Sequence, residues 1–174
     1  MDTGTLVVAA VFVAICVLPF IFFGRGHRKL RKKFKLLLSQ LAEKNGGKIT
    51  AIETIGNFGI GIDENKNMAY FVRKTDEGIL EKEVSLAEIK NCKLKTTTNY
   101  FEGGEKVVNS IDFEFFGNDA GKPAVIFNLY NADIDSSTLP GELQTAEKWE
   151  RIFKGALKKS AQVIKSQVKS TAVV

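Results

Sequence analysis

The chain has 174 residues, of which 44% are hydrophobic and 26% are charged, a composition that indicates a folded protein. Its 25 basic residues outnumber its 20 acidic ones, but seven of the basic residues lie between positions 24 and 36, where no acidic residue occurs. The rest keeps 18 basic residues (25 less seven) against 20 acidic ones, so it lacks the basic face that a general nucleic-acid binder needs. We therefore expect no nucleic-acid partner.

The first predicted element is a membrane span over residues 5–23. This stretch, TLVVAAVFVAICVLPFIFF, holds no charge, and about 20 apolar residues suffice to cross a bilayer. A secretory signal peptide would carry positive charge before its apolar core, whereas Asp2 precedes this stretch and the basic residues follow it. Residues 1–24 are therefore expected to form an uncleaved anchor in the plasma or inner membrane. Because basic residues beside a span stay cytoplasmic, the N-terminus would lie outside and the following domain in the cytoplasm.

Residues 25–46 are predicted to form a basic amphipathic helix beside the membrane, and Asn45-Gly46-Gly47 is a suitable end for it. Five apolar residues recur every three or four positions and so share one face: Leu30, Phe34, Leu37, Leu38 and Leu41. Seven basic residues are candidate contacts for anionic lipid headgroups: Arg25, Arg28, Lys29, Arg31, Lys32, Lys33 and Lys35. A topology signal with incidental lipid contact and a dedicated lipid-recognition site both fit this pattern.

From Ile49 the helical period gives way to alternation, which predicts β-strands. FGIGID and MAYFVRK, separated by the turn DENKN, predict a β-hairpin, and Gly59 and Gly61 indicate close approach of another segment or strong curvature. Four further strands are expected over residues 80–86, 92–98, 107–117 and 124–131. Six or seven short strands in succession predict an antiparallel sandwich or partly open barrel in a domain of residues 47–158.

A long amphipathic helix is predicted to follow the strands and to cap them. Thr145 is its candidate N-cap, its end is expected near Lys169, and residues 159–174 would form a helix extension and tail. The predicted fold class is therefore α+β. Ten residues are predicted to form the structural core: Phe58, Ile60, Ile62, Ile111, Phe113, Phe115, Val125, Phe127, Trp149 and Phe153.

The order of these elements resembles the pleckstrin-homology-like (PH-like) fold, and bacterial PH-like domains in particular. VIFNLYNADIDSSTLPGELQTAEKWERIFKGAL resembles its last strand, loop and capping helix, and IGIDENKNMAYFVRK followed by KEVSLAEIKNCKL resembles its hairpins; the resemblance covers about residues 49–157. It implies two sheets packed almost at right angles, with a helix closing one end and Trp149 in the core. Relatives that bind phosphoinositides use basic residues at the first hairpin, where this chain has Asp63 and Glu64, and carboxylates oppose a phosphate site.

The sequence shows no arrangement of residues typical of catalysis or metal binding. His27 is the only histidine, and GxSxG, P-loop and HExxH motifs are absent. Asp112 and Glu114 share a strand face and are interpreted as exposed alternating positions, and NADID at residues 131–135 lacks the spacing of a calcium loop. The two cysteines, Cys16 and Cys92, form no CxxC pair. No enzymatic activity, cofactor or metal is expected.

These features predict a single-pass membrane protein that presents a cytoplasmic PH-like module for protein binding or scaffolding. The alternative is a sensor of anionic lipid surfaces that uses the basic segment and part of the domain. The sequence specifies neither the protein partner nor the oligomeric state.

Overall fold

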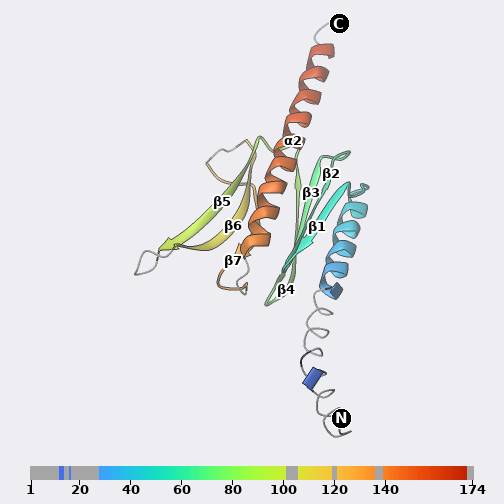
Figure 1. Cartoon of the computed structure of the whole chain (residues 1–174). Coiled ribbons are helices and arrows are strands. Elements are labelled where there is room, and N and C mark those ends of the chain that lie inside the picture. Colours follow the sequence, from blue (N-terminus) through green and yellow to red (C-terminus); the bar gives the residue numbers. More distant parts are fainter. Residues whose placement is uncertain are drawn as a thin grey trace.

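The computed structural model describes residues 28–100, 106–118, 121–135 and 139–171, together with Phe12, Val13 and Cys16. Within these residues a helix of residues 28–44, named here the basic helix, precedes seven strands and a long C-terminal helix (Figure 1). The elements are β1 (Ala51–Ile55), β2 (Phe58–Asp63), β3 (Met68–Thr75), β4 (Gly78–Ser85), β5 (Asn91–Tyr100), β6 (Lys106–Phe116), β7 (Val125–Asn131) and α2 (Leu139–Thr171). The predicted α+β class with antiparallel strands and a C-terminal helix is confirmed.

The predicted membrane span of residues 5–23 lies outside the described residues, except for Phe12, Val13 and Cys16. In the part of the chain that the structure describes, no helix is both long enough and apolar enough to cross a bilayer. Arg25 and His27 also lie outside the described residues, so the basic segment is described from Arg28 onward.

Strands β1 to β4 form one antiparallel sheet in chain order, and its turns follow from local sequence. Gly56, with φ of 49°, occupies the two-residue turn between β1 and β2, where a positive φ favours glycine. Between β2 and β3, the Asp63 carboxylate accepts hydrogen bonds from the backbone N–H groups of Asn65 (2.9 Å) and Lys66 (3.1 Å). The hairpin predicted around DENKN is confirmed.

Strands β5, β6 and β7 form a second antiparallel sheet. Along β6, Ile111, Phe113 and Phe115 are fully buried, whereas Asp112 and Glu114 alternate with them and are partly exposed. This period of two is the pattern of a strand with one face in the core.

The main core lies between the inner faces of the two sheets and α2. The rings of Phe71 on β3 and Phe127 on β7 stack with centroids 5.0 Å apart, which joins the sheets. From α2, Phe153 packs edge-on against Phe113 at 5.3 Å, and Trp149 lies beside Phe153 at 5.5 Å. α2 thus covers the open side between the sheets and then continues beyond them (Figure 1).

The predicted form was a sandwich or a partly open barrel; the described strands form two separate antiparallel sheets, which are not closed into a barrel. Side chains, and not strand pairing, connect β4 to β7. Lys82 donates from Nζ to the carbonyl oxygen of Ile126 (2.7 Å), and Arg73 on the neighbouring strand donates from Nη1 to that of Asn128 (2.7 Å). Two long cationic side chains of the first sheet therefore reach the edge of β7 in the second sheet. In a closed barrel, backbone hydrogen bonds between strands would join these two sheet edges instead.

Helix α2 begins at Leu139, so the prediction that Thr145 is its N-cap was wrong. Thr145 lies within the helix and is 5% exposed. Proline is tolerated in the first helical turn, where its missing N–H would have no partner in the helix, so Pro140 does not delay the start. A Cβ at Gly141 would lie 2.7 Å from Cδ1 of Ile55, which shows that the first turn approaches β1 closely.

Candidate functional site

The apolar side of the basic helix belongs to the folded domain. Phe34, Leu38 and Ala42 are fully buried against Tyr70 and Val72 on the outer face of the β1–β4 sheet. Seven partly buried residues surround this second cluster: Leu30, Leu37, Leu41, Ile49, Ile52, Met68 and Ile79. The basic helix and the β domain therefore share one packed interface, and the helix forms a third layer beside the first sheet (Figure 1).

Glycines let the basic helix approach this sheet and fix its end. A Cβ at Gly59 would lie 3.1 Å from Cδ1 of Leu38 and 3.2 Å from Cβ of Phe34, closer than ordinary contact. At the C-terminus, the N–H groups of Gly47 and Gly46 bond the carbonyls of Ala42 (2.8 Å) and Glu43 (2.9 Å), and Gly46 has φ of 64°. This is a Schellman cap. The predicted close approach at Gly59 and the predicted end of the helix are both confirmed.

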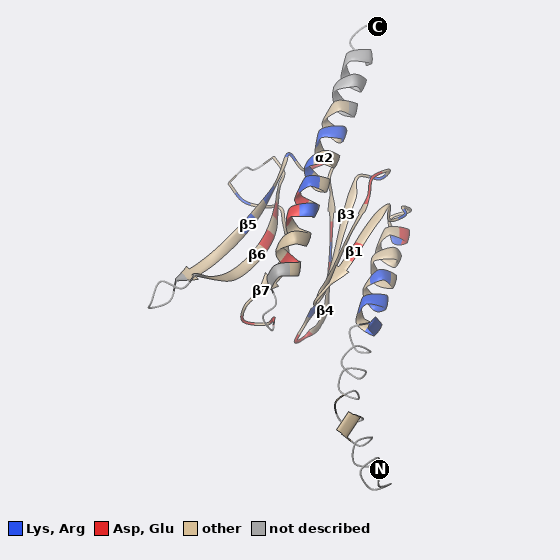
Figure 2. Cartoon of the chain, viewed as in Figure 1, with Lys and Arg blue, Asp and Glu red and all other residues tan. Residues whose placement is uncertain are grey.

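The other side of the basic helix is strongly positive (Figure 2). All six predicted headgroup contacts that are described have exposed side chains: Arg28, Lys29, Arg31, Lys32, Lys33 and Lys35. Within the described residues, none of them takes part in an ion pair. Leu36 lies on the same side, three and four residues after Lys33 and Lys32, and is 58% exposed. This basic surface therefore combines uncompensated cations with an exposed leucine.

A shallow hollow lies where this basic surface meets the first sheet. It has a volume of about 300 Å³ and is lined by Arg31, Lys32 and Lys35 of the basic helix and by residues 52–54 of β1. The lining includes Glu53, whose Oε2 accepts hydrogen bonds from Nζ of Lys148 (2.9 Å) and Nε1 of Trp149 (2.8 Å). Glu53 is thus already paired with α2.

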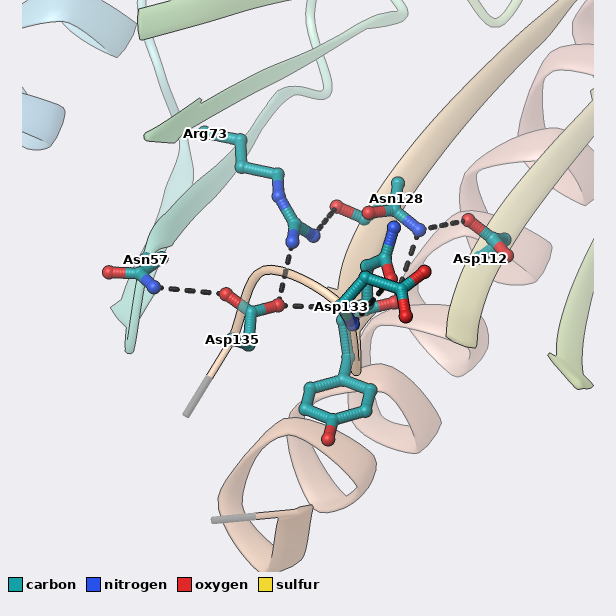
Figure 3. Close-up of polar contacts among 8 residues, drawn as sticks. Asn57, Arg73, Asp112, Asn128, Asp133 and Asp135 are labelled. Carbon is teal, nitrogen blue, oxygen red and sulfur yellow. Dashed lines mark hydrogen bonds and ion pairs between the residues drawn. The ribbon is translucent and has the colours of Figure 1, made fainter. Parts of the chain in front are cut away.

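A second polar feature connects the sheets in the interior (Figure 3). Nη2 of Arg73 donates to Oδ2 of Asp135 at 2.6 Å, and the two side chains are only 2% and 11% exposed. Oδ1 of Asp135 accepts a hydrogen bond from Nδ2 of Asn57 (2.9 Å), and Oδ2 also accepts from the N–H of Asn131 (2.9 Å). With its oxygens engaged in this way, Asp135 holds the loop after β7 against the first sheet.

The network continues along the second sheet. Nδ2 of Asn128 donates to Oδ1 of Asp112 (2.6 Å), and Oγ of Ser110 donates to Oδ2 of the same carboxylate (2.7 Å). Glu114, the other candidate acid, pairs instead with Lys95 at 2.9 Å. Asp112 and Glu114 therefore have separate partners and are not joined as an acid pair.

Sequence reasoning missed this network, although one signal was present. Arg73 follows Ala69 and Phe71 at a spacing of two, which places it on the core-facing side of β3. An arginine at such a position requires a buried partner. The partner, Asp135, lies in the NADID segment. Within the described residues, no group of three or more potential metal ligands occurs.

A larger groove, of about 830 Å³, opens between residues 83–90, the β6–β7 connection and α2. Its lining includes the apolar side chains of Leu86, Ile89 and Leu157, together with Glu88 and Lys90. The lining of this groove is therefore mixed, with apolar, acidic and basic side chains.

The residues predicted as core lie in the interior. Nine are at most 1% exposed, and Val125 is partly buried at the edge of the same cluster. Cys92 is also buried there, and burial, with a smaller effect of Glu150, raises the pKa of its thiol to about 12. Tyr70 is buried under the basic helix, and burial raises the pKa of its hydroxyl group. In the described part of the chain that hydroxyl has no hydrogen-bond partner.

Among known proteins, no protein family, no curated protein and no solved structure matches this chain.

Proposed function

We propose that the chain is a membrane-associated module with three parts. The apolar N-terminal stretch is the anchor, the basic helix contacts anionic headgroups, and the β domain is presented to a protein partner on the cytoplasmic side. One observation carries this proposal: the apolar side of the basic helix is enclosed by the first sheet while its six described basic side chains are exposed. A helix fixed in this way transmits membrane contact to the whole domain.

The charge on the basic helix is sufficient for such contact. A basic residue near an anionic membrane surface contributes about 1 kcal/mol, and the attraction fades within a Debye length. Six such residues therefore provide a substantial but salt-sensitive attraction. Leu36 adds an exposed apolar group to this surface, and an interfacial helix places such apolar side chains in the membrane.

We also propose that the β domain is PH-like. Four strands in one antiparallel sheet, three in a second and a C-terminal helix with a buried tryptophan support this resemblance. An experimentally determined structure that superimposes on PH-like domains over both sheets and α2 is the expected outcome. A different strand order would contradict the proposal.

Membrane contact by the basic surface is tested with a polarity-sensitive dye on Leu36→Cys in the full chain, with Cys16→Ser as background. The chain is reconstituted in vesicles of neutral lipid and in vesicles that also contain anionic lipid. We expect a blue-shifted emission in the anionic vesicles that high salt reverses. The control is Thr97→Cys, an exposed position on β5, where we expect no such shift. Equal responses at both positions would overturn the proposed orientation.

Topology is tested by protease treatment of intact spheroplasts. Protection of residues 28–171 supports the cytoplasmic location, and cleavage within the domain contradicts it. Partner binding is tested by photo-crosslinking in native membranes from Ala161, which lines the larger groove. A specific adduct from this position, absent from Thr97, supports protein binding through the groove, whereas equal crosslinking from both positions contradicts it.

A further inference from the structure

The hollow between the basic helix and β1 gathers three cations that the described part of the chain leaves without an ion pair. Arg31 and Lys35 are four residues apart and therefore lie on one flank of the helix, above β1. Lys32 lines the same hollow. Lys29 and Lys33, also four residues apart, lie on the opposite flank and do not line it. The positive charge of the basic helix is thus divided into two sides with different surroundings.

The one carboxylate in the lining does not neutralise these cations. Oε2 of Glu53 accepts hydrogen bonds from Lys148 at 2.9 Å and from the indole of Trp149 at 2.8 Å. Both donors belong to α2, on the other side of β1 from the basic helix. The charge of Glu53 is therefore compensated from α2, and the hollow retains a positive charge that an anion can neutralise.

Strand β1 adds neutral hydrogen-bonding groups. Among the described strands it pairs only with β2 and is an edge strand, so alternate N–H groups along its other edge have no strand partner there. Thr54, which also lines the hollow, carries a hydroxyl group. A guanidinium, two ammonium groups and neutral donors are suited to a compact anion with several oxygens, and phosphate has this character.

We propose that this hollow binds the phosphate group of a phosphate ester, supplied either by a phospholipid headgroup or by a soluble phosphate. This inference rests on the proposed function and extends it, because it turns general attraction to anionic membranes into a defined site on one flank of the basic helix.

The test uses the full chain in micelles of a neutral detergent at constant ionic strength. Trp149 is the only tryptophan, and its hydrogen bond to Glu53, which lines the hollow, couples its fluorescence to changes at β1 from the opposite face of the sheet. Inorganic phosphate is titrated in one arm and short-chain phosphatidic acid in the other, with sodium chloride as the reference. We expect a saturable change in emission with at least one phosphate source and none with chloride.

Two double variants that remove equal charge distinguish a site from diffuse attraction. Arg31→Gln with Lys35→Gln alters the hollow, and Lys29→Gln with Lys33→Gln alters the opposite flank. We expect the first pair to weaken phosphate binding by about tenfold or more and the second by less than about twofold. Far-UV circular dichroism verifies that both variants fold.

Each result decides the proposal. A response to phosphatidic acid alone identifies a lipid source, a response to inorganic phosphate alone identifies a soluble one, and a response to both shows that the phosphate group suffices. Equal weakening by the two double variants, or no saturable response to either source, overturns the site. Salt-sensitive contact of Leu36 with anionic vesicles would still stand in that case, so failure of the site and failure of the proposed function are distinguishable.

Discussion

Nη2 of Arg73 lies 2.6 Å from Oδ2 of Asp135, although the two residues are 62 positions apart in the chain. Arg73 belongs to β3 in the first sheet, and Asp135 lies in the loop that leads from β7 to α2. Arg73 is almost fully enclosed and Asp135 is largely enclosed, so bulk water solvates both charges poorly. The loss of one partner therefore leaves the other as a buried and uncompensated charge.

Replacing Arg73 by methionine is expected to destabilise the domain by about 3–5 kcal/mol. The free energy of unfolding is measured by urea denaturation of the full chain in neutral detergent, followed by circular dichroism. Lys154→Met is the control, because the pair of Lys154 with Glu150 is exposed, and its loss should cost less than about 0.5 kcal/mol. Adding Asp135→Asn to Arg73→Met should recover part of the loss. Equal effects of the two single variants would show that the buried pair is not important for stability.

Trp149→Ala is expected to destabilise the domain by about 3–5 kcal/mol, as for other large truncations in a core. The indole is 1% exposed, and its N–H donates to Glu53. Leu143→Ala in the same helix is the matched control, because Leu143 is 37% exposed and should cost less than about 1 kcal/mol. Thermal unfolding monitored by circular dichroism compares the variants. Similar melting temperatures for both would contradict the position of Trp149 in the core.

Replacing each of two glycines by alanine should change the stability of the domain in opposite directions. Gly59→Ala places a methyl group against Leu38 and Phe34 and is expected to cost about 1–3 kcal/mol through crowding between the basic helix and the sheet. Gly155→Ala, in the interior of α2 with no atom within 4 Å of the added Cβ, should stabilise by about 0.5–1 kcal/mol. Urea denaturation of both variants tests this difference in sign. A stabilising Gly59→Ala would indicate that the basic helix does not pack as described.

Raising the pH should remove a contribution of Cys92 to stability. Its pKa is raised from 9.0 to about 12, so above pH 9 the unfolded chain releases the thiol proton while the folded chain retains it. The stabilising contribution is complete below pH 9 and is lost as the pH rises toward 12. From about pH 8 to about pH 10.5 the wild type should lose about 2 kcal/mol more than Cys92→Ala. Parallel pH profiles for the two proteins would contradict this.

Local periodicity predicted much of the fold. The alternation of Ile111, Phe113 and Phe115 predicted β6, and the spacing of Phe34 and Leu38 predicted the buried side of the basic helix. These signals are strong because each element has one face in the core and the other outside it. The residues 51–55 of β1 lack that contrast, since all five are partly buried, and no separate strand was predicted there.

Features that depend on distant segments were not predictable from local patterns. The spacing of Arg73 indicates that it faces the core, but only the fold brings Asp135 to it. The contact between β4 and β7 also depends on Lys82, whose side chain reaches the carbonyl of Ile126, 44 positions further along the chain. Likewise, the basic residues of the candidate site were evident from composition, whereas the hollow exists only because the edge of β1 lies beside Arg31 and Lys35.

The side chains that reach β7 also affect how this protein would associate with itself. An edge strand with free carbonyl groups is a template on which another chain can add a strand and begin an aggregate. On β7 the carbonyls of Ile126 and Asn128 are already bonded to Lys82 and Arg73. An incoming strand would have to displace both cations, and one of them is buried. The edge of β7 is thereby protected from intermolecular sheet growth by the same contacts that hold the two sheets together.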